Sequence, residues 1–500
     1  MRTMIDPSTP RRRGPRAWLA PLAWIAVALL AWCLPPRTAQ ALPLFARQTG
    51  QNCLACHAGG QFPELTPYGR MFKLTGYTIG TKTLPLSVMG VASYSSVADT
   101  SKSDSPGTDF YKNKDPIFAT GSVFAGGRIS DNVGAFVQLT YDRYGRVDDS
   151  GNYHGTWGSD NMELRYADRR IDDQRDLIWG VSANNNPSVS DPWNTAAAWM
   201  QYVPVPSPSS SQFIDGTTPY PGFASDGNVA GVTGYLYWNR SIYAELGTYR
   251  TSNKVLSFLH RGNEESAQFK GNLNPYWRVA YNREWGASSL MVGATGMYAK
   301  FFDADTDHND PGNLGSYRDT GIDAQYQYLL DPHTVTAQLS YMRHVENHSP
   351  NSLLGASPYF LADGVTPVAP FSATDTTHVL RMKLGYVYRA KFGGSLAYFN
   401  LSGNTNTENQ SSGYDSNGQI TSTDPLGTGI TSTRVNGSLT GNPATRGTTW
   451  EVFWLPVQYV RVGAQYTAYS RYNGAGSNYD GFGRNARDNN SLFLYVWAAY

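Results

Sequence analysis

The 500-residue sequence contains only three cysteines, carries a formal net charge of +1 and has no long apolar run after its start. The near-zero charge gives no reason to expect a nucleic-acid partner. The mean hydropathy is −0.42, and the body of the chain has no apolar span of the length that a transmembrane helix needs.

Glycine (50), tyrosine (33) and tryptophan (13) are plentiful. A hydrophilic chain rich in these residues is typical of alternating β-strands with one face toward lipid and the other toward water. A large soluble all-β protein has a similar composition, so composition alone leaves both classes open.

Residues 1–41 have the pattern of a cleaved secretory signal peptide. An arginine-rich start is followed by an apolar run over 17–34 and by the cleavage motif Ala39-Gln40-Ala41. The run is close to the lower length limit of a spanning helix, so a retained membrane anchor is the alternative. Prolines within and after the run favour cleavage. Cys33 would leave with the signal peptide, and the exported chain would keep two cysteines.

Those two cysteines belong to the motif Cys53-Leu54-Ala55-Cys56-His57, which has the C-x-x-C-H spacing of a c-type haem attachment site. Two thiols three residues apart on one helical turn can each add to a haem vinyl group. The adjacent imidazole can reach the iron from the same side. A redox dithiol and a chance grouping are the alternatives, but the βαβ pattern of a thioredoxin-like site is not visible around the motif. The sequence therefore predicts one covalent haem c with His57 as an axial ligand.

Residues 42–85 form the predicted haem segment, which is too short to bury a core without a staple such as covalent haem. The remaining chain, residues 86–500, is the expected cover for its open face. Three cations, Arg47, Arg70 and Lys73, are candidates to pair with the haem propionates. The alternative for each is a solvated surface charge.

From residue 86 onward, apolar and polar residues alternate with the period of β-strands. Val460 and Val462 are apolar, for example, whereas Arg461 between them is polar. Long polar connections alternate with tight turns and predict an all-β fold, a sixteen-stranded antiparallel outer-membrane β-barrel. A β-sandwich or solenoid is the alternative. The long connections are predicted near 96–115, 145–160, 185–228, 251–273, 303–315, 346–375, 402–446 and 473–488, and the turns near 130–132, 167–175, 239–240, 285–286, 331–332, 390–391 and 455–458.

Several further runs accompany the haem motif, at 46–50 (ARQTG), 62–70 (FPELTPYGR), 72–74, 125–142, 164–168, 184–187 and 191–195. Together they resemble the fused monohaem cytochrome–porins, an outer-membrane family best known from iron-oxidising bacteria. The similarity is tight over the haem segment and roughly the first third of the predicted barrel. It implies an N-terminal cytochrome that plugs a sixteen-stranded barrel. It also implies electron flow from an extracellular donor, Fe(II) in the best-known activity, to a periplasmic cytochrome or other acceptor.

Two function classes stay open. The first is an outer-membrane electron-transfer protein that oxidises Fe(II), since a cofactor within the span lets electrons cross an insulating membrane. The second is a diffusion porin whose haem segment serves as a gate or sensor. Electron transfer with another donor, or in the outward direction, is a further alternative. A bare porin needs no haem, which favours electron transfer.

Methionine is the expected second axial ligand of the haem iron, because His/Met ligation raises the potential as a donor such as Fe(II) requires. No histidine lies between His57 and His154, so a second histidine close in sequence is absent. Met89, at the start of the first predicted strand, is the first choice, and Met71 is the alternative. A core or lipid-facing methionine is the competing interpretation of Met89.

Two connections carry further expectations. The connection 185–228 is rich in proline and serine and is expected to fold inward as a constriction, with a loose surface loop as the alternative. The acidic run 303–310 is expected to attract cations at the outer face. It lacks the glycine and glutamate of an EF-hand, and a solvated acidic loop is the alternative.

Overall fold

The computed structural model describes residues 43–500 except for 61–63, 82–85, 100–112, 148–152, 186, 194–228, 253–267, 303–305, 356–371, 407–437, 439 and 480–482. The chain divides into two units, Met1–Ala39 and Gln40–Tyr500, and all described residues belong to the second. The predicted signal peptide lies outside the described residues. No described helix is long and apolar enough to cross a membrane.

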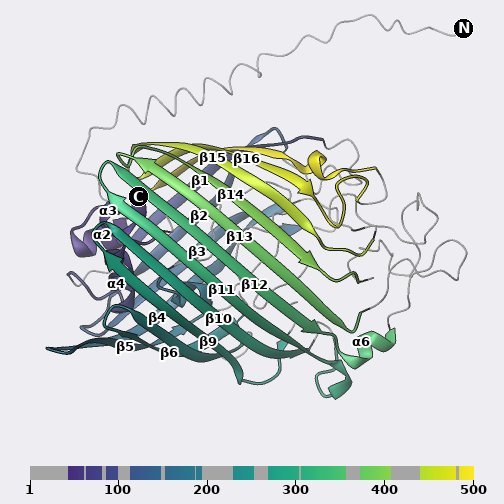
Figure 1. The fold of residues 1–500 in the computed structure, drawn as a ribbon, viewed down its shortest axis with the longest axis horizontal. Coiled ribbons are helices and arrows are strands. Elements are labelled where there is room, and N and C mark those ends of the chain that lie inside the picture. Colours follow the sequence, from purple (N-terminus) through teal and green to yellow (C-terminus); the bar gives the residue numbers. More distant parts are fainter. Residues whose placement is uncertain are drawn as a thin grey trace, which may run out of the picture. The chain divides into compact units, whose positions relative to one another are not determined.

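The second unit is a closed antiparallel β-barrel (Figure 1). Seventeen strands form one sheet, and without the two-residue strand β8 they make a ring of sixteen, which confirms the predicted barrel. The ring closes because β1 pairs with both β2 and β17; Val91 lies opposite Thr120 on one side and Trp497 on the other. The strands are β1 (Leu86–Val97), β2 (Pro116–Arg128), β3 (Val133–Val147), β4 (Tyr153–Asp172), β5 (Arg175–Asn184), β6 (Val229–Trp238), β7 (Ile242–Thr251), β8 (Gln268–Phe269), β9 (Asn274–Trp285), β10 (Ser288–Phe302), β11 (Leu314–Leu330), β12 (His333–Asn347), β13 (Thr374–Tyr388), β14 (Phe392–Gly403), β15 (Thr445–Val457), β16 (Val460–Arg471) and β17 (Ser491–Ala499).

The residues in the tight turns have backbone conformations that suit β-hairpins. Asn239 and Arg240, between β6 and β7, have φ angles of 47° and 52°. Arg389 and Ala390, between β13 and β14, have φ angles of 51° and 50°. Two successive left-handed residues give the backbone twist that matches the right-handed twist of paired strands. The hairpins therefore close with very few residues, as the sequence predicted.

Strand β4 departs from the sequence prediction at both ends. It runs over Tyr153–Asp172, and so it contains much of the predicted connection 145–160 and of the predicted turn 167–175. The polar residues of 153–160 and the charged residues of 168–172 predicted connections, but in the structure both stretches pair with neighbouring strands, Trp157 with Tyr141 and Arg169 with Ile178. Between them, Glu163 and Arg165 point into the barrel and form a fully buried ion pair of 2.6 Å.

The two faces of each strand differ in polarity. On β9, Arg278 and Asn282 are buried on the lumen side, whereas Trp277, Val279 and Tyr281 are exposed on the outside. An apolar outer surface around a polar interior is the arrangement of barrels that sit in lipid. The chain is therefore a porin-like barrel of the outer-membrane type.

Short helices precede the barrel: α2 (Pro43–Thr49), α3 (Cys53–Cys56), η2 (Ala58–Gly60) and α4 (Pro67–Leu74). The Thr66 side chain accepts a 3.1 Å hydrogen bond from the Gly69 N–H, and Pro67 fills the first helical position, so the sequence itself starts α4 there. Other short helices lie in the connections: α5 (Pro187–Ser190), η4 (Pro311–Asn313), α6 (Pro350–Gly355) and η6 (Ala486–Asn489). Figure 1 shows α2, α3 and α4 at the end of the barrel opposite α6.

The described part of residues 43–81, here called the plug, reaches opposite walls of the barrel. Tyr77 donates a hydrogen bond to Glu163 of β4, and Glu64 forms a 2.7 Å ion pair with Lys383 of β13. Counted along the ring, β4 and β13 are eight strands apart out of sixteen, so they face each other across the lumen. The plug therefore crosses the barrel from wall to wall.

The plug lies at the end of the barrel where the strands join by tight turns. Arg70 contacts Glu284 and Gln327, which lie one and three residues before the ends of β9 and β11. The Cys53 Sγ lies 3.6 Å from the carbonyl oxygen of Gln458, in the turn between β15 and β16. The long connections leave from the other end.

Candidate functional site

The two cysteines of the C-x-x-C-H motif begin and end the single turn α3. The Asn52 side chain accepts a 3.2 Å hydrogen bond from the Ala55 N–H and fixes the start of the turn. At its end, the His57 N–H donates to the Cys53 carbonyl oxygen over 2.7 Å. Cys53 is buried and Cys56 is half-buried. The local sequence thus holds two thiols and an imidazole on one short stretch of backbone.

His57 forms an isolated antiparallel β-bridge with Leu65. Desolvation lowers the pKa of the imidazole to about 4, and the nearby Glu64 carboxylate opposes this shift without cancelling it. The side chain is therefore neutral near pH 7. A neutral imidazole is the form that ligates metal ions.

The environment of Cys56 favours the protonated thiol over a reactive thiolate. Burial raises its pKa to about 11. Redox-active and nucleophilic cysteines have a pKa lowered by nearby positive charge or by a helix N-terminus. The environment of Cys56 therefore disfavours the redox-dithiol alternative.

A cavity of about 220 Å³ lies between α4 and the barrel wall. Tyr68 lines the cavity, and burial raises the pKa of its phenol. The lining combines apolar and cationic side chains: Pro67, Tyr68, Arg70, Met71 and Leu74 from α4, and Trp193, Tyr237, Arg240 and Glu284 from the barrel and its connections.

These residues fit a covalent haem in their chemistry. Cys53 and Cys56 have the required spacing on one turn, His57 is neutral, and Arg70 and Arg240 supply positive charge beside apolar surface. The cavity is smaller than the roughly 300–1,000 Å³ typical of pockets for drug-sized ligands, so it alone accommodates only part of a haem.

Arg70 is an anchor of the plug as well as a lining residue. It is buried, and its guanidinium donates to the Leu65 carbonyl over 3.0 Å and to Gln327 Oε1 over 2.9 Å. It also forms a 3.4 Å ion pair with Glu284. Lys73 is likewise buried, and it donates to the Asp191 carbonyl over 2.7 Å. Their role toward propionates stays a prediction.

The other predicted site residues lie on different elements. Met71 lines the cavity from α4, beside Arg70. Met89 is on β1, on the same face of the strand as the buried lumen-side residues Ser87 and Val91. Arg47 is exposed on α2, with its guanidinium 5.8 Å from the centre of the Tyr500 ring. The structure thus places Arg70 and Met71 at the cavity, whereas Cys56, Met89 and Arg47 do not line it. Methionine ligation of a haem iron stays a prediction.

The described start of the connection 185–228 lies in the lumen. Asp191 forms a 3.2 Å ion pair with Arg278 of β9. Trp193 is 1% exposed and packs edge-on against Tyr243, with ring centres 5.4 Å apart. Trp193 was not predicted as a site residue, although it belongs to one of the family-like runs. Residues 194–228 of the predicted constriction lie outside the described residues.

The acidic run 303–310 is described only in part, because Asp303 and Asp305 lie outside the described residues. Asp307 accepts a 2.9 Å hydrogen bond from the Asn309 N–H. Asp310 accepts from the Gly312 N–H over 2.8 Å and starts η4. Both described carboxylates therefore stabilise the local turn.

No protein-family model matches the chain, and no curated protein sequence matches it. Solved structures of similar fold include OmpF of Salmonella typhi in complex with daunomycin, at 10% identity and a TM-score of 0.42, covering 83% of this chain and 97% of that one. The outer-membrane channel DcaP of Acinetobacter baumannii is 13% identical with a TM-score of 0.40, covering 84% and 97%. The anion-selective porin from Comamonas acidovorans is 9% identical with a TM-score of 0.39, covering 84% and 99%.

Proposed function

We propose that this protein is an outer-membrane c-type cytochrome that carries electrons between an extracellular donor and a periplasmic acceptor. The observation that carries the proposal is the location of Cys53, Cys56 and His57 in a plug that reaches opposite walls of a closed barrel. A redox group held there would lie within a barrel that crosses an otherwise insulating membrane.

In this proposal the residues of the chain hold and orient the group. Each thiol, of Cys53 and of Cys56, would add across one vinyl group, with sulfur bonding to one carbon and hydrogen to the other, so attachment consumes no oxidant. His57 would ligate the iron as a neutral imidazole, with Met71 or Met89 as the opposite ligand. Bound haem would supply the one-electron redox change.

Fe(II) is the proposed donor, and the resemblance of the plug sequence to the cytochrome–porins supports it. Each Fe(II) would lose one electron outside the cell and leave as Fe(III), so that the insoluble product stays outside. With the tight turns on the periplasmic side, as in bacterial barrels, the plug would lie next to a periplasmic cytochrome or other acceptor.

A diffusion porin with a haem gate or sensor is the second candidate function. A closed barrel with a polar lumen and an apolar exterior is the architecture of a channel. In that case the haem would carry no net flux of electrons. Electron transfer from a donor other than Fe(II), or outward, differs from the first proposal only in substrate or direction.

Two measurements test the proposal. Stopped-flow mixing of the ferric protein with Fe(II) under anaerobic conditions is expected to produce the reduced haem spectrum. In liposomes that enclose an electron acceptor, external Fe(II) is expected to reduce that acceptor. The matched control is the Cys53→Ala/Cys56→Ala double variant, which should fold but lose both signals and the haem-stained band on a denaturing gel. An open ion-conducting channel across which no electrons pass would establish the porin instead.

A further inference from the structure

Four cationic side chains lie together on the outside of the barrel, near the strand ends from which the long connections leave. Lys300 of β10, Arg318 of β11 and Arg343 of β12 are exposed, whereas both sequence neighbours of each are buried. Lys270, which directly follows β8, is exposed as well, and its neighbour Phe269 packs against buried side chains of the lumen. Successive residues of a strand face opposite sides, so the four cations point away from the lumen. They are called the basic belt below.

The basic belt is continuous across neighbouring strands. Lys270 lies directly opposite Lys300, because its backbone N–H donates to the Lys300 carbonyl oxygen over 2.8 Å. Arg318 is diagonal to Lys300, since it pairs with Tyr298, two residues away along β10. Arg343 is diagonal to Arg318 in the same way. Direct and diagonal neighbours on one face of a sheet have their Cβ atoms about 4.5–8 Å apart, so one extended anionic group can reach several of these side chains.

The basic belt lies at the outer edge of the apolar surface. The strands cross the wall obliquely (Figure 1), so the shift toward the plug at each diagonal step keeps the four residues near one depth. Tyr298 and Tyr341 share the outside with them, and aromatic side chains mark the membrane interfaces of such barrels. Ile322, which is 55% exposed, lies further along β11 toward the plug. With the tight turns on the periplasmic side, the belt stands at the headgroups of the outer leaflet.

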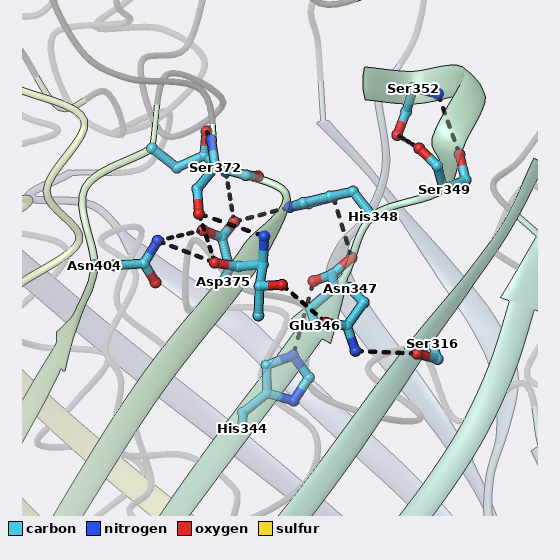
Figure 2. Close-up of polar contacts among 12 residues, drawn as sticks. Ser316, His344, Glu346, Asn347, His348, Ser349, Ser352, Ser372, Asp375 and Asn404 are labelled. Carbon is cyan, nitrogen blue, oxygen red and sulfur yellow. Dashed lines mark hydrogen bonds and ion pairs between the residues drawn. The ribbon is translucent and has the colours of Figure 1, made fainter. Parts of the chain in front are cut away.

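The basic belt has no counter-charge on its own side of the wall. Within the described part of the chain, none of its four side chains forms an ion pair or a side-chain hydrogen bond. The strand β10 contains no carboxylate, and those of β11 and β12, Asp319, Asp323 and Glu346, alternate with the belt and face the lumen. Figure 2 shows Glu346 turned toward His344 and His348 there. Like charges side by side are destabilising, so an anion from outside the chain would stabilise the belt.

We propose that the basic belt binds the phosphate groups of a lipid in the outer leaflet of the membrane. Lysine and arginine bind phosphate through charge-assisted hydrogen bonds, and the planar guanidinium can make two of them in parallel. The acyl chains of the same molecule would lie against the outside of β10 and β11, where Val292 and Ile322 are exposed. The wall therefore matches both the charged and the apolar part of such a lipid. The proposal does not rest on the proposed function, because it needs neither haem nor electron transfer.

The test is native mass spectrometry of the purified full-length protein in neutral detergent, titrated with lipid A, a glycolipid that carries two phosphate groups. We expect lipid A to stay bound to the parent chain. Each lysine or arginine near an anionic lipid surface strengthens binding about fivefold, so the Lys300→Gln/Arg318→Gln/Arg343→Gln variant should bind lipid A about 100-fold more weakly. The conservative variant Arg318→Lys/Arg343→Lys keeps the charge and should keep most of the binding.

Arg283→Gln is the matched control, because Arg283 is exposed on the outside of β9 at the plug end of the barrel. It should bind lipid A as the parent does. Undiminished binding by the triple variant, or an equal loss in Arg283→Gln, would overturn the proposal. Displacement of lipid A by inorganic phosphate at the same concentration of phosphate groups would assign the belt to free phosphate and would also overturn it.

A second measurement needs no substitution. Salt screens exposed charges, because the Debye length falls from about 10 Å at 0.1 M to about 3 Å at 1 M ionic strength. The affinity of the unchanged protein for lipid A should therefore fall as salt is added, whereas its affinity for the uncharged detergent should not. Lipid A binding that is independent of salt would mean that only the acyl chains are recognised, and the basic belt would have no part in it.

Discussion

At the scale of single residues, Gly69 sets how closely α4 approaches the haem motif. A Cβ placed on this glycine would lie 2.2 Å from the Cys56 carbonyl oxygen, which is backbone and cannot move aside cheaply. We expect Gly69→Ala to separate α3 from α4 at a cost of about 1–3 kcal/mol, the usual range for overpacking, and to lower the haem content per chain. Haem staining against total protein measures this effect.

Gly385→Ala is the control for that substitution, because its Cβ would meet nothing closer than the Thr336 carbonyl oxygen at 3.8 Å. It should keep the haem content of the parent. Equal haem content in Gly69→Ala would show that the close approach of the two helices is not needed for attachment.

The ion pair between Glu64 and Lys383 is a second contact of the plug that single substitutions can test. Their side chains are 8% and 13% exposed, and the pair joins the plug to β13. Removing one partner of a buried pair strands the other charge, so Lys383→Met should weaken docking of the plug by about 3–5 kcal/mol. Hydrogen exchange of the plug amides measures the loss.

The Glu64→Gln/Lys383→Met double variant removes both charges and should recover most of the protection. Exchange in Lys383→Met as slow as in the parent would mean that the pair does not hold the plug.

At the scale of elements, successive residues of each strand face different environments, the outside of the barrel and its lumen. On β11, Ile322 is 55% exposed on the outside, whereas Asp323 is 1% exposed and bonded to Arg278 in the lumen. Ile322→Lys puts a charge near the middle of the strand on the lipid side, and should destabilise the folded barrel in a bilayer by about 2–4 kcal/mol. Equilibrium unfolding in lipid vesicles gives the value.

Leu330→Lys is the matched change on the same strand, because Leu330 is equally exposed at 54% but ends the strand. Near the membrane interface the cost should fall to about 0–1 kcal/mol. Equal costs at the two positions would contradict a lipid-facing outer surface.

The alternation of apolar and polar residues was enough to predict the number of strands and the positions of most turns. It failed at both ends of β4, because the polar residues of 153–160 and the charged residues of 168–172 look like connections in sequence although they pair with β3 and β5. Patterns within one strand also do not show contacts between strands. His344 lies beside Asp319, and His348 lies beside Asp375, because of a register that only the folded sheet fixes.

A haem site was predicted from three residues at fixed spacing, and it stays a prediction. The lining of the cavity beside α4 was not predicted. Trp193 comes from a connection and Tyr237 from the barrel wall, and nothing near them in sequence points to α4. Arg70 was predicted as a propionate partner, but its contacts with Gln327 and Glu284 depend on long-range packing.

At the scale of the whole molecule, the plug and the ring can be separated genetically. A chain that keeps residues 1–41 and continues directly at residue 86 should form a barrel with an open lumen, since sixteen-stranded barrels without a plug leave an aqueous channel. Planar-bilayer conductance should rise from low in the full chain to that of an open porin in the deletion.

The full-length Cys53→Ala/Cys56→Ala variant tests in the same measurement whether the proposed haem contributes to closing the lumen. It should conduct as little as the parent. High conductance there would mean that haem, and not the polypeptide, closes the lumen.

The attachment of the plug to β4 through Tyr77 and to β13 through Glu64 also has a mechanical meaning. A thin ring flattens easily into an oval, and the softest direction is any diameter without support. A bar fixed at two diametrically opposed points removes that freedom along its own axis. The plug therefore acts as a strut that keeps the cross-section round under the lateral pressure of the membrane. Spin labels on the outer faces of β4 and β13 should report a wider spread of separations once the strut is removed.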